Sequence, residues 1–166
     1  KNEKIIHNNS WVWSVAFSPD SNCIVSGGSD GKINIWDVNN STLIKTWQAV
    51  NRDVRCVKFS VNGEFIVSGG RNVKEGTKGM VHVWKANTYE NIWSNIHGNC
   101  SVVRSIDISK DNNRVVSGGD NGNVKIWDIE TGENIFSFAY RNTWINSVVF
   151  SKNANGEFII SGINGG

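Results

Sequence analysis

A single short pattern is written four times along this chain of 166 residues. The copies read SVAFSPDSNCIVSGG at 14–28, CVKFSVNGEFIVSGG at 56–70, SIDISKDNNRVVSGG at 105–119 and SVVFSKNANGEFIISG at 147–162. The intervals are 42, 49 and 42 residues, counted from Phe17 to Phe59, then to Ile108, then to Phe150. Repetition at this period predicts an array of like units, because each unit covers its apolar face by stacking on the next.

Each unit has the pattern of four short β-strands joined by tight turns. The first strand of the first unit is Val-x-x-Val-x-Phe at 12–17, and a turn of sequence SPDS connects it to the second strand, CIVSG. A D-G or N-G turn leads into a third strand with alternating apolar residues, which reads KINIWD at 32–37, MVHVWK at 80–85 and NVKIWD at 123–128. Weaker fourth strands follow, such as STLIKTW. Because no segment keeps a helical period, we predict an all-β chain whose neighbouring strands pair antiparallel.

These units resemble the WD40 repeat. The resemblance is carried by the Trp-Asp pairs at 36–37 and 127–128, by the Ser-Gly-Gly triplets and by FSPD at 17–20. It covers nearly the whole chain and implies a β-propeller, in which each four-stranded antiparallel sheet is one blade around a central channel. The positions that the resemblance assigns to the structural framework of the repeat are Ser26, Asp30, Trp36, Asp37, Ser68, Trp84, Ser117, Trp127, Asp128 and Ser161.

The units depart from the family pattern at several positions. Trp84 is followed by Lys85 rather than by Asp, and Asn121 replaces the turn aspartate of the third unit. The family's histidine before the first strand of a blade is absent at the expected offset in all four units, with His7 and His97 nearby but shifted. We therefore expect the Asp-His-Ser-Trp hydrogen-bond network of the family to be incomplete in every blade. Packing between blades is then expected to supply most of the stability.

We interpret residues 1–166 as a single propeller segment. Its repeats span about 7–48, 49–96 and 97–139, with a truncated repeat at 140–166 and the last strand of a preceding blade at 1–6. The pattern predicts about 15 strands in an open arc of about four blades, with two bare blade faces. Three interpretations follow: a slice of a longer propeller, two self-associated arcs that complete one ring, or a small ring that closes alone.

Two tryptophans flank Val12 in the stretch SWVWSV. The two residues between Val12 and Val15 break strict alternation, as a β-bulge does. In the family this bulge aims the residue after the valine at the top face of the propeller, and the residue before the valine lies on the same rim. The residues after the valine are Trp13, Arg55, Arg104 and Asn146, and those before it are Trp11, Asp53, Val102 and Trp144.

A longer connection in the second unit, RNVKEGTKG at 71–79, is expected as a loop on the same face, where Asp30, Asp53 and Asp120 oppose its positive charge. Exposed aromatic and arginine side chains are typical of interaction hot spots, and the positive charge fits an acidic or phosphorylated peptide. The alternative is that the indoles cap the blade cores and the charges belong to ordinary solvated loops. The candidate partner-binding residues are Trp11, Trp13, Arg55, Arg71, Lys74, Lys78, Arg104, Trp144 and Asn146.

The composition limits the class of protein. The formal net charge of +2 offers no strong field toward nucleic acid or an anionic membrane, and no apolar run is long enough to cross a bilayer. Cys23, Cys56 and Cys100 lack CxxC spacing, which is typical of free thiols in a reducing compartment. We expect an intracellular protein, cytoplasmic or nuclear, without membrane association.

No motif marks a catalytic centre, and we predict neither enzyme activity nor a metal or cofactor. GGSDG at 27–31 matches GxSxG, but it stands between two strands rather than before the helix that a nucleophile elbow needs. His97 and Cys100 form one HxxC pair, with no second pair to complete a zinc site. The predicted function is a non-catalytic scaffold that binds a protein or an acidic peptide. The alternatives are an RNA- or DNA-binding propeller and a segment of a larger multidomain enzyme or signalling protein.

Overall fold

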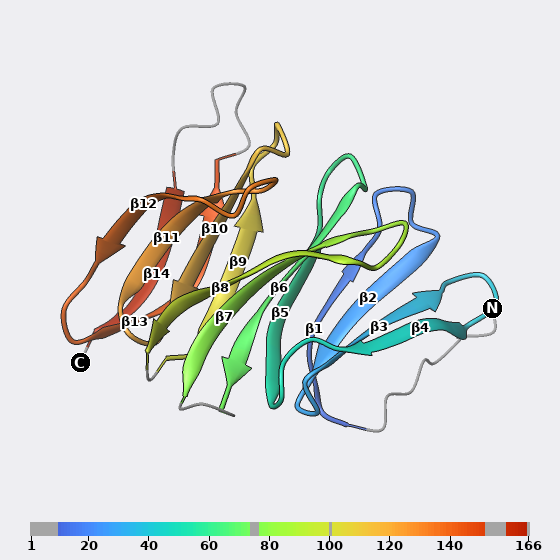
Figure 1. Ribbon diagram of the computed structural model, residues 1–166, viewed down its shortest axis with the longest axis horizontal. Coiled ribbons are helices and arrows are strands. Elements are labelled where there is room, and N and C mark those ends of the chain that lie inside the picture. Colours follow the sequence, from blue (N-terminus) through green and yellow to red (C-terminus); the bar gives the residue numbers. More distant parts are fainter. Residues whose placement is uncertain (1–9, 74–76, 100, 152–158, 166) are drawn as a thin grey trace.

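The computed structural model describes residues 10–73, 77–99, 101–151 and 159–165, and every regular element in these ranges is a β-strand (Figure 1). The strands form four antiparallel sheets, each in sequence order. The first contains β1 (Val12–Phe17), β2 (Cys23–Gly28), β3 (Lys32–Asp37) and β4 (Thr42–Gln48). The second contains β5 (Asp53–Phe59), β6 (Phe65–Asn72), β7 (Lys78–Lys85) and β8 (Asn91–Asn99). The third contains β9 (Val103–Ile108), β10 (Arg114–Gly119), β11 (Asn123–Asp128) and β12 (Asn134–Ala139), and the fourth β13 (Thr143–Phe150) and β14 (Ile159–Gly165).

The predicted all-β class and its four-stranded antiparallel blades are confirmed. The structure describes 14 strands where the sequence predicts about 15, and the remaining strand was expected within 1–6, outside the described residues. Since the described ranges hold no helix, none of them meets the length and hydropathy of a membrane span. The exact repeat boundaries stay a prediction.

The four sheets pack side by side in chain order and form an open arc (Figure 1). The first strand of each sheet makes the spine of the arc, because β1 packs on β5, β5 on β9 and β9 on β13. Apolar clusters fill the interfaces between consecutive sheets. Between the second and third sheets, for example, Val83, Ile106 and Trp127 belong to one buried cluster.

The glycine after the repeat serine lets neighbouring blades approach closely. A Cβ atom on Gly69 would lie 2.5 Å from Val103 Cγ1, and one on Gly118 would lie 2.8 Å from Val148 Cγ1 and collide with Ile145. Both valines belong to the first strand of the next sheet. An added methyl group would therefore push two blades apart, so the repeated Ser-Gly-Gly is a packing requirement.

The first strand of the arc lies on an open face. Val12, Val15 and Phe17 were expected to point into the packing between blades, but they are 43, 64 and 60% exposed, because no described strand covers them. The equivalent Val54 and Val57 of β5 are buried, since the first sheet covers them. The family pattern therefore holds where a preceding sheet is described, and the exposed face of β1 corresponds to one of the two bare blade faces that the sequence predicts.

Each first strand carries the predicted bulge. The β1–β2 ladder skips Trp13, and the corresponding ladders skip Arg55, Arg104 and Asn146. A bulge residue is left out of the pairing, so its side chain is re-aimed. We call the end of the sheets that bears these four residues the bulge rim. It corresponds to the predicted top face and lies along the bottom of the view in Figure 1.

The loop predicted at 71–79 is wrong in part. β6 continues through Arg71 and Asn72, and the pairing with β7 extends to Asn72 opposite Lys78. Arg71, Asn72, Lys78 and Gly79 therefore lengthen the hairpin of β6 and β7. On the other side of β6, Arg71 pairs with Asp53 at the start of β5. Lys74 lies outside the described residues.

The third sheet holds the histidine, serine and tryptophan of the family network, while Asn121 stands at the aspartate position, so the network lacks only its aspartate there. Trp127 Nε1 donates to Ser117 Oγ at 2.7 Å, and His97 Nδ1 lies 2.9 Å from the same oxygen. The other ring nitrogen of His97 is 3.2 Å from the carbonyl oxygen of Asn123. The shifted offset is accommodated because β8 extends to Asn99 and carries His97 beside the third sheet.

The other framework residues act mainly through turns and through serine–tryptophan pairs. Asp37 Oδ1 accepts from Asn40 N at 2.8 Å, and Asp128 Oδ1 accepts from Thr131 N at 2.8 Å. These aspartates thereby close the turns between the third and fourth strands. The further contacts are Trp36 Nε1 to Ser26 Oγ at 2.9 Å, Trp84 Nε1 to Ser68 Oγ at 3.1 Å, Lys32 N to Asp30 Oδ1 at 3.1 Å, and the pairing of Ser161 with Val148.

Candidate interaction surface

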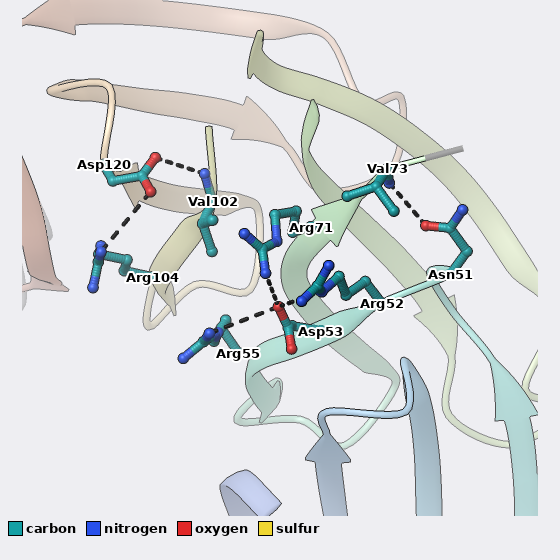
Figure 2. Close-up of polar contacts among 9 residues, drawn as sticks. All are labelled: Asn51, Arg52, Asp53, Arg55, Arg71, Val73, Val102, Arg104 and Asp120. Atoms are coloured by element: carbon teal, nitrogen blue, oxygen red, sulfur yellow. Dashed lines mark hydrogen bonds and ion pairs between the residues drawn. The ribbon is translucent and has the colours of Figure 1, made fainter. Parts of the chain in front are cut away.

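Three arginine side chains converge on one buried carboxylate at the bulge rim (Figure 2). Asp53 Oδ2 lies 2.7 Å from Arg71 Nη2, 3.6 Å from Arg55 Nη2 and 3.9 Å from Arg52 Nε. The Asp53 side chain is only 7% exposed, so solvent screens its charge weakly. One carboxylate balances one guanidinium, which leaves a net charge of about +2 on these four residues, the Asp53 cluster.

Strand geometry explains why these side chains meet. Asp53 is the first residue of β5 and is paired directly with Arg71 of β6. Arg55 follows two positions later as the bulge residue, and Arg52 immediately precedes the strand. Residues that are distant in sequence are therefore placed at one sheet end by backbone pairing alone.

The bulge arginines also contact tryptophans of neighbouring blades. The guanidinium carbon of Arg55 lies 3.9 Å from the ring centroid of Trp13, and that of Arg104 lies 4.7 Å from the ring centroid of Trp144. Arg104 Nη2 is in addition 3.9 Å from Asp120 Oδ2. An arginine–tryptophan–aspartate arrangement thus occurs twice on the described part of the rim. The copy around Asp53 gathers three arginines, and the copy around Asp120 has Arg104.

Trp11 and Trp13 form an apolar wall beside the Asp53 cluster. Trp11 is 75% exposed and Trp13 is 40% exposed, and their ring centroids are 6.0 Å apart in an edge-to-face arrangement. A hollow opens between this wall and the arginines. It is lined by Ser10, Trp11, Trp13, Ser29, Arg52, Asp53, Arg55 and Arg71. Such a hollow suits a group with one anionic and one apolar part.

The bulge arginines and Arg71 retain unused hydrogen-bond donors. The Nε atoms of Arg55, Arg71 and Arg104 are buried and find no acceptor within the described part of the chain. A buried donor without an acceptor is unfavourable. Because these Nε atoms are themselves out of reach of solvent, a partner would contact other atoms of the guanidinium groups, whose side chains are 31, 25 and 34% exposed for Arg55, Arg71 and Arg104.

Only some of the predicted partner-binding residues line the hollow. Trp13, Arg55 and Arg71 belong to the hollow, with Trp11 at its edge. Arg104 and Trp144 form the separate pair, Asn146 is an exposed bulge residue, Lys78 begins β7, and Lys74 lies outside the described residues.

Sequence reasoning missed the central role of Asp53. It treated Asp53 and Asp120 as charges that oppose the basic patch, whereas each of them lies against an arginine of the rim. The signal was present in the repeat, because the residue before the first valine pairs with the residue after Ser-Gly-Gly. In the second unit those two residues are Asp53 and Arg71.

The other reactive side chains are explained by packing. Ser29 lies in the turn between β2 and β3, the strand–turn–strand context that argues against a nucleophile. Burial lowers the pKa of His82 and of His97 to about 4 and raises that of Cys56 to about 12. Within the described ranges, no three His, Cys, Asp or Glu side chains are placed to hold a metal ion.

Stacked four-stranded blades with serine–tryptophan hydrogen bonds define a β-propeller repeat protein. A family model described as WD40, "WD domain, G-beta repeat", matches residues 3–37, 41–85 and 91–128. The chain therefore belongs to the WD40 repeat family, whose proteins generally mediate interactions with proteins or RNA.

Curated relatives match parts of the chain. It is similar to U3 small nucleolar RNA-associated protein 4 of Saccharomyces cerevisiae, with 36% identity over 59 residues that cover 36% of this chain and 8% of that protein. It is similar to eukaryotic translation initiation factor 3 subunit I of Phaeosphaeria nodorum, with 28% identity over 46% of this chain and 22% of that protein. Protein ROOT INITIATION DEFECTIVE 3 of Arabidopsis thaliana is 30% identical over 44% of this chain and 15% of its own length. The chain thus spans less than a quarter of each of these relatives.

Solved structures share the fold. The structure of U3-55K superposes with a TM-score of 0.75, and the crystal structure of RRP9 WD40 repeats with a TM-score of 0.76. In both comparisons the identity is 16%, and the match covers 86% of this chain and 43% of the other. At this identity the likeness establishes the propeller fold alone.

Proposed function

We propose that this chain is a non-catalytic scaffold segment that captures a protein partner on its bulge rim. The observation that carries the proposal is the repeated contact of a bulge arginine with an exposed tryptophan of an adjacent blade, at 3.9 Å for Arg55 with Trp13 and 4.7 Å for Arg104 with Trp144. The family membership supports a scaffold role, and the rim supplies a specific surface for it.

The chemistry of the rim matches that of binding hot spots. Tryptophan and arginine are the residue types that contribute most to protein–protein interfaces when a partner buries them. Here Trp11 and Trp144 are 75 and 50% exposed, so a partner would remove much apolar surface from water. The bulges and ion pairs hold the arginines in place before binding, which lowers the entropy that binding costs.

RNA binding is the second candidate function. It is favoured by the exposed indoles beside arginines, since aromatic rings and cations together bind single strands. The name of one relative, U3 small nucleolar RNA-associated protein 4, points in the same direction. Against it, the formal net charge is only +2, and one face of Trp13 and one face of Trp144 are already occupied by arginines.

Affinity capture with a matched pair of variants tests the proposal. The variant Arg55→Gln with Arg104→Gln removes both rim cations but keeps side-chain length. The control, Arg114→Gln, alters an arginine at the opposite end of β10, which lies 3.9 Å from Asp111 and 5.8 Å from the Phe150 ring centroid. Proteins that the native chain and the control retain should be lost from the rim variant. Equal recovery by all three proteins contradicts the proposal.

Salt dependence separates the two candidate functions. RNA held through phosphate contacts would dissociate with a steep slope of log affinity against log salt, whereas peptide docking gives a shallow slope. A cytoplasmic or nuclear site of action stays a prediction. The names of the relatives, a translation initiation factor subunit and a nucleolar RNA-associated protein, favour it, and fluorescence microscopy of the tagged protein would test it.

A further inference from the structure

We infer that the hollow beside the Asp53 cluster is a binding site for a phosphorylated side chain of a partner peptide. The inference rests on the proposed function, because it names the chemistry that the bulge rim recognises. Its core is the convergence of Arg52, Arg55 and Arg71 on one side of a hollow whose other side is formed by two tryptophans.

The charge of the hollow matches a phosphate group. Three guanidinium groups and one carboxylate leave about two positive charges, and a phosphorylated side chain carries about −1.5 to −2 at pH 7. The counter-charge already present, Asp53, is 7% exposed and is reached through one oxygen, Oδ2, by all three arginines. Asp53 therefore gathers the arginines without consuming their donors, since three guanidinium groups carry about fifteen N–H bonds.

The direction of the donors favours phosphate over a carboxylate. A planar carboxylate is matched by a single guanidinium fork, whereas a phosphate presents three oxygens that can accept from several arginines at once. Arg55 and Arg71 stand on two different strands, β5 and β6, and their side chains are 31 and 25% exposed. Two separately anchored arginines, with Arg52 at the edge, suit a tetrahedral acceptor.

The aromatic wall favours a peptide over free phosphate or a nucleic acid. The guanidinium carbon of Arg55 lies over the Trp13 ring, 3.9 Å from its centroid, a contact that a lysine ammonium would not reproduce. Trp11, which is 75% exposed, adds an open apolar surface beside the anion site. A phosphoserine or phosphothreonine followed by an apolar residue would fill both parts. A base would compete with Arg55 for one face of Trp13.

A degenerate peptide library provides the direct test. One pool carries phosphoserine at a fixed central position, and matched pools carry serine or glutamate there. Each pool is passed over the immobilised 166-residue chain, and the retained peptides are quantified by mass spectrometry. We expect the phosphoserine pool to be retained at least ten-fold more than the serine pool and more than the glutamate pool, with apolar residues enriched beside the phosphoserine. Equal retention of the three pools would overturn the inference.

The variants are chosen so that the fold survives. The first variant, Arg52→Gln with Arg55→Gln, lowers the net charge of the Asp53 cluster from about +2 to about 0 and leaves the 2.7 Å pair of Arg71 with Asp53 in place. Arg55→Lys keeps the positive charge but loses the paired N–H donors of the guanidinium group and its contact with the Trp13 ring. We expect at least a ten-fold loss of phosphopeptide retention in the first variant and at least a three-fold loss in the second, with retention unchanged in Arg114→Gln. Retention that persists in both variants with native melting curves would place the phosphate elsewhere.

The outcomes also separate this inference from the proposed function. If partner capture depends on the rim but phosphorylation of the library has no effect, the rim remains a docking surface and the phosphate site is wrong. If single-stranded oligouridine displaces the retained peptides and binds equally well itself, the hollow is a nucleic-acid site and the inference is overturned. If neither capture nor library retention depends on the rim, both proposals fail.

Discussion

The guanidinium of Arg55 stacks on the indole of Trp13 at 3.9 Å and thereby links the bulge of the second sheet to the bulge of the first. A second arginine–tryptophan contact, at 4.7 Å, runs in the other direction, from the bulge residue Arg104 of the third sheet to Trp144 of the fourth, which is paired within its ladder. Each contact crosses from one blade to the next. The rim is therefore both a candidate binding surface and a part of the connection between blades.

A double-mutant cycle should measure this contact. We expect Arg55→Gln and Trp13→Ala to show a coupling free energy of about 1 kcal/mol in urea unfolding, which is typical of a partly exposed cation–π pair. The longer Arg104–Trp144 pair should give about half of that coupling. Additive effects in both cycles would show that the rings and the guanidinium groups are merely adjacent.

Ser117→Ala should destabilise the chain more than Ser26→Ala. Ser117 Oγ contacts both Trp127 Nε1 and His97 Nδ1 at full burial, whereas the one contact of Ser26 Oγ among the described residues is with Trp36 Nε1, in a partly buried site. Loss of Ser117 Oγ leaves two buried ring nitrogens without this partner. We therefore expect Ser117→Ala to lower the free energy of unfolding by about 2–3 kcal/mol, and Ser26→Ala to lower it by about 1 kcal/mol. Urea unfolding of the two variants checks the order, and equal losses would show that the His97 contact adds nothing.

The packing role of glycine is tested by Gly118→Ala against Gly162→Ala. Both glycines follow the repeat serine, but a Cβ on Gly118 would collide with Ile145, whereas one on Gly162 would have only Ser147 Cβ nearby, at 3.6 Å. We expect Gly118→Ala to lower the free energy of unfolding by about 1–3 kcal/mol and Gly162→Ala to leave it nearly unchanged. A large loss at Gly162 would point to backbone effects instead of contact between blades.

Stability should fall as the pH drops from 7 to 5. Burial lowers the folded-state pKa of His82 and of His97 from 6.5 to about 4, so in this range the unfolded chain binds protons that the folded chain does not. Their stabilising contribution is complete above pH 6.5 and is lost progressively toward pH 4, by an amount on the order of 3 kcal/mol for each histidine. The urea midpoint measured at pH 7, 6 and 5 checks this. A flat midpoint, or the same slope in His82→Phe with His97→Asn, would contradict it.

The lowered pKa values of the turn aspartates act in a different pH range. Hydrogen bonds from Thr131 and from Ser109 lower the pKa of Asp128 and of Asp111, respectively, below the ordinary 3.8. Carboxylates of this kind contribute stability above their unfolded pKa and lose it only as the pH falls below about 4. The interval from pH 7 to 5 therefore reports the histidines.

The repeat sequence alone determined the strands, their antiparallel order and the bulges. Alternating apolar residues, D-G and N-G turns and the Val-x-x-Val spacing are local signals, and strand pairing depends on such local chemistry. These local signals place Trp13, Arg55, Arg104 and Asn146 at equivalent bulge positions.

Only the tertiary structure decided how the charges and the histidine are used. Asp53 looked like an opposing charge in the sequence, and it became the centre of three arginines because the β5–β6 register sets it against Arg71. His97 looked displaced from the family position, and the extension of β8 brought it back to Ser117. Both outcomes depend on side chains from separate strands or blades. Their distance and burial follow from packing across the sheets, which no window of the sequence contains.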